Sequence, residues 1–253
     1  MAPKDFDNQI IWLIGASTGI GNALAQELAQ RGACLALSAR RTMHDDPLLQ
    51  SPASPHQFFA LDVADPQQIK PCLEAILAHY GRLDRVIFLA ATYTPMPLTA
   101  LDLELCQDHF TVNVMGLLHL LPSVLPVLQA QPQRAQLAIC ASVAGFIGLP
   151  GGQPYSASKA ALINIAESLS AELGDQLDIK LINPGFVRSP LTDKNTFPMP
   201  MIMEPHHAAR CIADGLLSHG FEIHFPKPFT LMIKLLRLLP YALSLWITRR
   251  IKV

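Results

Sequence analysis

The stretch Gly15-Ala16-Ser17-Thr18-Gly19-Ile20-Gly21 decides the fold, because it joins two segments of different periodicity. Residues 9–14 before it form an apolar run typical of a buried strand, and apolar residues recur at helical spacing over residues 20–31 after it. The backbone N–H groups at such a helix start favour a phosphate, and glycines let a phosphate approach closely. Taken alone, the turn fits nucleotide binding or simple tight packing of a strand against a helix.

The alternation of short apolar runs with helix-length segments continues along the chain. Further strands are expected at residues 33–38, 56–61, 85–91, 136–141, 179–183 and 221–225. Helices are expected at residues 66–80, 101–128, 155–173 and 205–217, the second of them broken or bent by Pro122 and Pro126. Right-handed crossovers between such strands predict an α/β fold, a doubly wound parallel sheet of about seven strands in the Rossmann arrangement. We expect one domain, with residues 1–225 as the dinucleotide-binding and catalytic part and residues 226–253 as its C-terminal extension.

Composition excludes several classes of protein. Half of the 253 residues are apolar and 15% are charged, which excludes intrinsic disorder. A net charge of −1 argues against a general attraction to nucleic acid. The five cysteines are far apart, which indicates reduced thiols. The start of the chain has no apolar stretch typical of a secretory signal, so a cytoplasmic location is expected, with any membrane contact peripheral and on the inner face.

The second predicted strand ends in Ser38-Ala39-Arg40-Arg41. Dinucleotide sites specific for NAD usually carry an acid about 20 residues past the glycines, which accepts hydrogen bonds from the adenosine ribose. Two guanidinium groups favour a 2′-phosphate instead, so the sequence favours NADP(H) over NAD(H). The alternative is an ordinary solvated pair of arginines.

Tyr155 and Lys159 stand at positions i and i+4, which places a phenol and an ammonium on one face of a helix. A fixed positive charge lowers the pKa of a nearby phenol. Such a phenol can give a proton to a carbonyl oxygen, or take one from an alcohol, while a hydride moves at the carbon. Ser142, at the end of its own strand, adds a hydroxyl for the same oxygen. An isolated pair of this kind is more often a helix surface pair.

Taken together, these motifs resemble the short-chain dehydrogenase/reductase family over about residues 9–225. Gly15, Gly19 and Gly21 match the glycine turn of the family, and Asp62-Val63 resembles its adenine-side pair. The catalytic tetrad of the family is matched by Asn113, Ser142, Tyr155 and Lys159. A further stretch resembles the nicotinamide-side segment of the family: Asn183-Pro184-Gly185-Phe186-Val187-Arg188-Ser189.

The resemblance implies a role for each matched residue. Tyr155 would be the general acid/base, Ser142 would orient the substrate oxygen, and Lys159 would lower the pKa of the tyrosine and hold the nicotinamide ribose. Asn113 would position a water that relays protons, and Val187 and Ser189 would contact the carboxamide. The residues expected to bind the cofactor are Gly15, Ser17, Thr18, Gly19, Ile20, Gly21, Arg40, Arg41, Asp62, Val63, Ala90, Tyr155, Lys159, Pro184, Gly185, Val187 and Ser189. The family also suggests a homodimer or homotetramer.

The chain departs from the family pattern at two places. Phe88-Leu89-Ala90-Ala91 stands where the family usually has Asn-Asn-Ala-Gly, and Ile14 stands where a threonine is common. Removing both members of a polar pair can be nearly neutral, so we interpret the two losses as complementary.

Residues 190–203 occupy the position of the variable substrate loop of the family. Their apolar members, expected to line a cavity for a hydrophobic substrate, are Phe197, Met199, Met201, Ile202 and Met203. The alternative is a loop that packs on the body. His206 and His207 are adjacent on a predicted helix and do not face each other, so no metal site is expected.

Residues 226–253 carry six basic residues and no acidic one, which leaves a charge of −7 for the rest of the chain. Leucines, a tryptophan and other apolar residues lie between the charges. This composition fits an interfacial helix on anionic lipid, or a helical pair that packs on the body or on a second subunit.

The sequence therefore predicts an NADP(H)-dependent oxidoreductase that interconverts a carbonyl and an alcohol on a small hydrophobic substrate, of which a lipid-like molecule is one option. The alternative is a nucleotide-binding regulatory protein, or an interaction protein recruited to membranes, with the same fold and little turnover.

Overall fold

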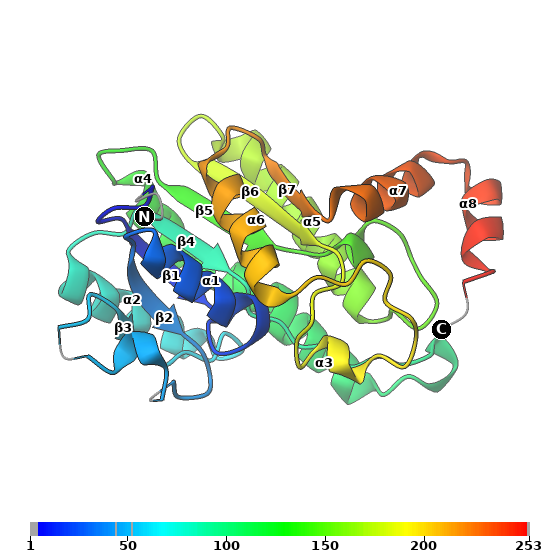
Figure 1. Cartoon of the computed structure of the whole chain (residues 1–253), viewed down its shortest axis with the longest axis horizontal. Coiled ribbons are helices and arrows are strands. Elements are labelled where there is room, and N and C mark those ends of the chain that lie inside the picture. The colour runs from blue at the N-terminus through cyan, green and yellow to red at the C-terminus, as the bar shows by residue number, and fades with distance from the viewer. Residues whose placement is uncertain (1–4, 44, 52, 252–253) are drawn as a thin grey trace.

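The described residues, 5–43, 45–51 and 53–251 of a computed structural model, form one sheet of seven parallel strands (Figure 1). The strands run in the order β3-β2-β1-β4-β5-β6-β7. Their bounds are β1 (Ile10–Ile14), β2 (Cys34–Ser38), β3 (Gln57–Phe58), β4 (Arg85–Phe88), β5 (Gln136–Cys140), β6 (Asp178–Pro184) and β7 (Glu222–Phe225). This order reverses between β1 and β4, which makes the sheet doubly wound and confirms the predicted fold class.

Helices connect the strands and cover both faces of the sheet. Their bounds are α1 (Gly19–Gln30), α2 (Pro66–Tyr80), α3 (Leu103–Phe110), α4 (Gly116–Gln129), α5 (Tyr155–Leu173), α6 (Pro205–Leu217), α7 (Lys227–Leu238) and α8 (Tyr241–Thr248). The predicted bounds of α2, α5 and α6 agree with the structure. For α2 the signals are local, because the Asp65 side chain accepts a hydrogen bond from the backbone of Gln67 at its start and Gly81 adopts a left-handed conformation at its end.

The core has two layers, one on each face of the sheet. Ile10, Trp12 and Ile14 of β1 pack on the side covered by α2, α4 and α5, whereas Ile11 and Leu13 pack on the side of α1 and α6. All five residues are buried, because successive side chains of a strand point to opposite faces and both faces are covered. This rigid centre positions the loops that follow the strands.

The long helix expected over residues 101–128 differs from the prediction. Pro122 and Pro126 both lie inside α4, which ends at neither of them. The interruption lies earlier, in a π-helical turn at Thr111–Met115 between α3 and α4. Such turns insert one extra residue into a helix and are frequent at functional sites. The sequence pattern showed the prolines but not this turn.

The stretch Leu103–Gln129 is long and apolar enough to cross a membrane by length and composition alone. Of its most apolar window, 44% is buried. Leu117, Leu120 and Val124 of α4 belong to the core beside α2 and α5. We therefore assign this stretch to the core.

Candidate active site

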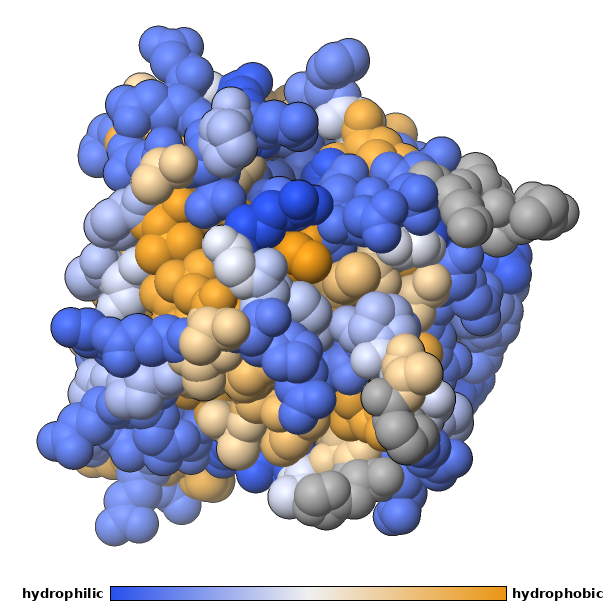
Figure 2. All heavy atoms as spheres, turned by 90° about the vertical axis from the view of Figure 1, so that its left-hand side faces the viewer, coloured by the Kyte–Doolittle hydropathy of each residue, from blue (hydrophilic) through white to orange (hydrophobic). Residues whose placement is uncertain are grey.

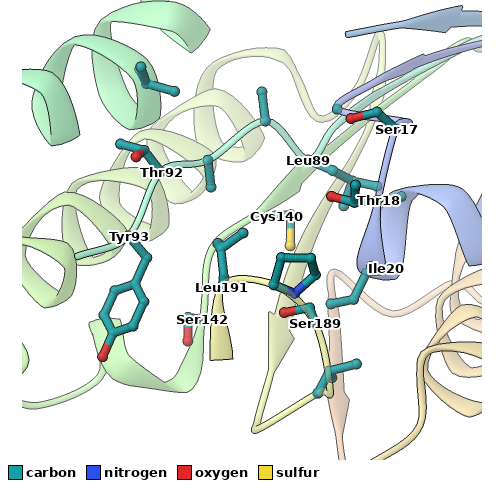
Figure 3. A pocket seen from close by; sticks show the side chains of 18 of the residues that line it. Ser17, Thr18, Ile20, Leu89, Thr92, Tyr93, Cys140, Ser142, Ser189 and Leu191 are labelled. Atoms are coloured by element: carbon teal, nitrogen blue, oxygen red, sulfur yellow. The ribbon is translucent and has the colours of Figure 1, made fainter. Parts of the chain in front are cut away.

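A cavity of about 370 Å³ opens at the carboxyl ends of the strands, where the strand order reverses. Figure 3 shows Ser17 and Thr18 of the turn after β1 on one side of it and Tyr93 and Ser142 on the other, with Cys140 between. Open α/β sheets bind their ligands at such switch points. The lining includes every residue predicted for the cofactor except Asp62, and all of the predicted tetrad except Asn113.

The glycine turn makes room for a ligand and for the adjoining strand. Gly15 has a φ of +94°, and a Cβ atom there would lie 2.7 Å from the backbone nitrogen of Ala90. A Cβ atom on Gly21 would lie 2.0 Å from the carbonyl oxygen of Gly15. Only glycine fits these two positions, so the start of α1 can approach both the sheet and a pyrophosphate.

The charges around the cavity are of one sign. Among the described residues that line it, Arg40, Arg41, Lys159 and Lys194 are basic and none is acidic. Arg40 and Arg41 are exposed directly after β2. This arrangement fits a ligand that carries several phosphate groups, and it fits the predicted dinucleotide.

Tyr155 and Lys159 of α5 reach the cavity beside the end of β5. The Lys159 Nζ atom lies 5.5 Å from the centre of the Tyr155 ring and donates a 2.9 Å hydrogen bond to the carbonyl oxygen of Cys140. Burial raises the pKa of the Tyr155 phenol, and a hydrogen bond with Ser142 partly lowers it. Burial lowers the pKa of Lys159. Burial has the largest effect on the pKa of Tyr155 and raises it. The expected lowering of this pKa by Lys159 therefore stays a prediction.

Ser142 lies at the start of the tight turn that follows β5. Its Oγ atom accepts a 3.1 Å hydrogen bond from the backbone nitrogen of Ala144. This bond caps the turn and orients the hydroxyl, which lines the same cavity as Tyr155. Two hydroxyl groups are thus available to one substrate oxygen.

Asn113 lies in the π-helical turn, is fully buried and does not line the cavity. Its Oδ1 atom accepts a 2.7 Å hydrogen bond from the backbone nitrogen of Thr92. Its Nδ2 atom donates to the carbonyl oxygen of Thr92 at 3.1 Å and to the Ser158 Oγ atom at 2.9 Å. Asn113 therefore joins the segment after β4 to α5 and positions both, while the expected water relay stays a prediction.

The two departures from the family pattern are filled by apolar packing. Ile14 and Phe88 are register partners in β1 and β4 and are buried in the same core layer. Leu89 lines the cavity.

Asp62, which was expected to bind the cofactor, does not line the cavity. Its Oδ1 atom accepts a 3.0 Å hydrogen bond from the backbone nitrogen of Ala64.

The loop of residues 190–203 contributes different residues from those expected. From this loop the cavity is lined by Pro190, Leu191, Thr192 and Lys194. The residues expected there, Phe197, Met199, Met201, Ile202 and Met203, are not among the lining residues. Met203 donates a backbone hydrogen bond to the carbonyl oxygen of Phe186, and this pairing returns the loop to the body. The expected lining by these five side chains is thus not found in this cavity, and their part in holding a substrate stays a prediction, as does the alternative of a loop that packs on the body.

Tyr93 was not predicted from the sequence. Its ring meets the ring of Tyr155 edge to face, with centres 4.8 Å apart. Its hydroxyl donates a 2.6 Å hydrogen bond to the Asn195 Oδ1 atom, and its carbonyl oxygen accepts one from the Lys194 Nζ atom at 2.6 Å. Tyr93 thus links Tyr155 to the loop of residues 190–203. An aromatic residue after the fourth strand was the only signal in the sequence.

His206 and His207 lie in the first turn of α6, and their ring centres are 4.1 Å apart, so the two rings meet, contrary to the expectation that they do not face each other. Within the part of the chain that the structure describes, no group of three or more His, Cys, Asp or Glu side chains is placed to hold a metal ion.

A family model described as short chain dehydrogenase matches residues 9–198. An uncharacterized oxidoreductase of Myxococcus xanthus is 34% identical over 244 residues, which cover 94% of this chain and 95% of the relative. An 11-beta-hydroxysteroid dehydrogenase A of Arachis hypogaea is 31% identical over 73% of this chain and 54% of its own length.

Solved structures show the same fold. A short-chain dehydrogenase/reductase of Burkholderia phymatum in complex with NAD matches with a TM-score of 0.82 at 21% identity, over 91% of this chain and 93% of the other. A 3-ketoacyl-(acyl-carrier-protein) reductase of Brucella melitensis complexed with NADH matches with a TM-score of 0.79 at 19% identity, over 87% and 98%.

Proposed function

The chain belongs to the short-chain dehydrogenase/reductase family and is a nicotinamide-nucleotide-dependent oxidoreductase, and from this premise we propose that it interconverts a carbonyl and an alcohol on a small hydrophobic substrate with NADP(H). The observation that carries this proposal is the meeting of Tyr155, Ser142 and Lys159 with the glycine turn in one cavity. We take residues 1–225 as the catalytic part and residues 226–253 as its extension.

Each catalytic side chain has a distinct task in this proposal. Tyr155 gives a proton to the carbonyl oxygen or takes one from the alcohol, and Ser142 donates a hydrogen bond to the same oxygen. Lys159 supplies positive charge beside the phenol and holds the ribose. Bound nucleotide supplies or accepts the hydride. Burial raises the pKa of Tyr155, which makes the phenol a weaker acid, so in this proposal positive charge beside the phenol must favour its deprotonated form during the reaction.

The preference for NADP(H) is proposed from Arg40 and Arg41. Both are exposed, line the cavity at the end of β2, and have no acidic neighbour in its lining. A 2′-phosphate would accept charge-assisted hydrogen bonds from either guanidinium group.

A hydrophobic substrate is proposed from the side chains near Ser142. The ring of Tyr93 and the side chain of Leu191 line the same cavity as this serine (Figure 3). Apolar surface of this kind favours an apolar substrate with one reactive polar group. We further propose a cytoplasmic enzyme that forms a homodimer or homotetramer.

The test is a titration of the protein with NADPH and with NADH, followed by nicotinamide fluorescence, and then a screen of hydrophobic ketones and aldehydes. Tighter binding of NADPH and turnover of an apolar carbonyl are expected. Tighter binding of NADH would overturn the assignment of Arg40 and Arg41. Binding of neither nucleotide would favour the alternative of an interaction protein with this fold.

A further inference from the structure

The exposed faces of α7 and α8 form an apolar surface at the C-terminal end of the described chain. In Figure 1 the two helices, orange to red, extend away from the sheet. We call this surface the C-terminal surface, and its exposed apolar residues are Leu231, Met232, Leu235, Leu238, Tyr241, Leu243, Leu245 and Trp246. At the opposite end of the molecule, hydrophilic residues interrupt the hydrophobic ones (Figure 2).

The helix α8 buries polar side chains and exposes apolar ones, the opposite of an ordinary surface helix. Ser244 and Thr248 are only 3% and 4% exposed, whereas Tyr241 and Trp246 are 84% and 54% exposed. A helix that packs on a body in water usually turns its apolar side inward. The outward side of α8 therefore fits an apolar environment better than it fits water.

The helix α7 is attached firmly, so its outer face is presented in a defined orientation. Phe229 and Ile233 are buried in the core. Lys234 forms an ion pair with Glu222 of β7, and its Nζ atom lies 5.8 Å from the centre of the Phe146 ring. Lys234 is thus neutralised against the body and does not contribute to the charge of the outer face.

Four further basic residues among the described ones of this segment face solvent beside the apolar ones. Lys227, Arg237, Arg249 and Arg250 are exposed, and no acidic residue occurs after Glu222. The Arg250 guanidinium carbon lies 3.5 Å from the centre of the Trp246 ring, and its Nη1 atom donates a 2.8 Å hydrogen bond to the Trp246 carbonyl oxygen. A cation stacked on an indole places charge and apolar surface together.

A second exposed apolar surface has the opposite charge. Leu98, Leu103 and Phe110 are exposed on and before α3, but acidic residues lie among them. These acidic residues are Asp102, Glu104 and Asp108. An anionic partner would be repelled there and attracted to the C-terminal surface.

We propose that the C-terminal surface docks the enzyme peripherally on a membrane that contains anionic lipids. Exposed apolar side chains enter the boundary between headgroups and acyl chains, and the four basic residues face the lipid phosphates. This inference goes beyond the proposed reaction and does not depend on it.

The test uses the whole chain and vesicles of phosphatidylglycerol and phosphatidylethanolamine, with phosphatidylcholine vesicles for comparison. The protein has two tryptophans; Trp12 is fully buried and Trp246 is exposed, so a blue shift of emission reports Trp246. We expect the shift and co-sedimentation with the anionic vesicles, and loss of both in high salt. Replacing Arg249 and Arg250 together by Ser should weaken binding by roughly 10- to 30-fold.

Matched variants distinguish docking through the C-terminal surface from non-specific adsorption and from contact between copies of this chain. Leu245→Ser with Trp246→Ser should abolish sedimentation, whereas Leu103→Ser on the acidic surface and Lys70→Ser on α2 should leave it unchanged. NADPH or NADH binding and thermal melting of each variant report whether it is folded. Equal sedimentation with both vesicle types, or none with the anionic ones, would overturn the proposal. So would light scattering that shows Leu245→Ser with Trp246→Ser converting an oligomer to a monomer in the absence of vesicles, since the surface would then join copies of this chain.

Discussion

The part of the cavity proposed to bind the nucleotide differs in construction from the part proposed to bind the substrate; we call them the nucleotide half and the substrate half. The nucleotide half consists of the turn Gly15–Gly21 and of Arg40 and Arg41, all within a few residues of the ends of β1 and β2. The substrate half combines Tyr93, Tyr155 and the loop of residues 190–203, which meet only through tertiary contacts. The first half follows from local geometry at strand ends, and the second depends on how distant loops pack. Substitutions should therefore affect the two halves separately.

The largest expected effect is that of Tyr155→Phe. Removal of the only proposed proton donor to the substrate oxygen should lower kcat by about 10²- to 10⁴-fold. Tyr155 is also one of the residues expected to bind the cofactor, but the variant keeps the ring and loses only the hydroxyl. The Kd for nucleotide should therefore rise by no more than about 10-fold, the effect of one lost hydrogen bond. Stopped-flow or steady-state turnover and a fluorescence titration measure the two quantities. If kcat falls little, Tyr155 is not the general acid/base.

The next effect concerns the nucleotide half. Arg40→Ala with Arg41→Ala should weaken NADPH binding by about 10- to 100-fold, because charge-assisted hydrogen bonds contribute about 1.5–3 kcal/mol. NADH binding should change little, since NADH has no 2′-phosphate. A titration of both nucleotides gives the ratio of the two Kd values. An unchanged ratio would show that the two arginines are an ordinary solvated pair.

The same contrast explains what could be predicted from the sequence. Gly15 and Gly21 could be recognised in the sequence, because a side chain at either position would clash with backbone atoms. A local constraint of this kind requires one residue type, glycine, which is visible in the sequence. The bounds of α2 were predicted correctly, and the structure shows local signals at both ends, the Asp65 side-chain cap and the left-handed Gly81. A strand was expected over residues 56–61, but β3 is only two residues long. It lies at the edge of the sheet, where Gln57 is exposed.

The substrate half was not predictable in the same way. Tyr93 and Asn195 are 102 positions apart, and their hydrogen bond depends on the relative placement of two loops. Phe197 was expected in the cavity, but its ring lies 6.0 Å from that of Phe186 instead. Apolar composition shows that a side chain will be buried, but it does not show against which surface.

A smaller effect is expected from Tyr93→Phe. This change removes the hydroxyl that holds Asn195 and keeps the ring beside Tyr155. The loss of one hydrogen bond, about 0.5–1.5 kcal/mol, should raise KM for the carbonyl substrate by about 2- to 10-fold and leave nucleotide Kd unchanged. Steady-state kinetics at saturating nucleotide measure the change.

The control for this prediction is a double-mutant cycle. Asn195→Ala alone should have a similar effect, and combining it with Tyr93→Phe should add little, because both changes remove the same interaction. Strictly additive effects would show that the hydrogen bond does not position the substrate loop.

The smallest effect is expected at the edge of the sheet that β2 and β3 form. The His56 Nδ1 atom accepts a 3.3 Å hydrogen bond from the backbone nitrogen of Leu35 in β2, and burial lowers the pKa of this imidazole from its ordinary value of about 6.5. The unfolded chain therefore binds a proton more readily than the folded chain below about pH 6.5, so the free energy of unfolding should fall as the pH is lowered through this value. The loss continues down to the folded pKa.

His56→Asn tests this assignment, because the amide oxygen can accept a hydrogen bond but does not titrate in this range. Thermal melting at about pH 7.5 and about pH 5.5 should show a larger drop in Tm for the natural chain than for the variant. The difference should be small, since a single partly buried group is involved and Asp46 raises the pKa of His56 in part. Equal drops in both proteins would assign the acid sensitivity to other groups. A matching drop in NADPH affinity at low pH, absent in the variant, would show that this edge supports the nucleotide half specifically.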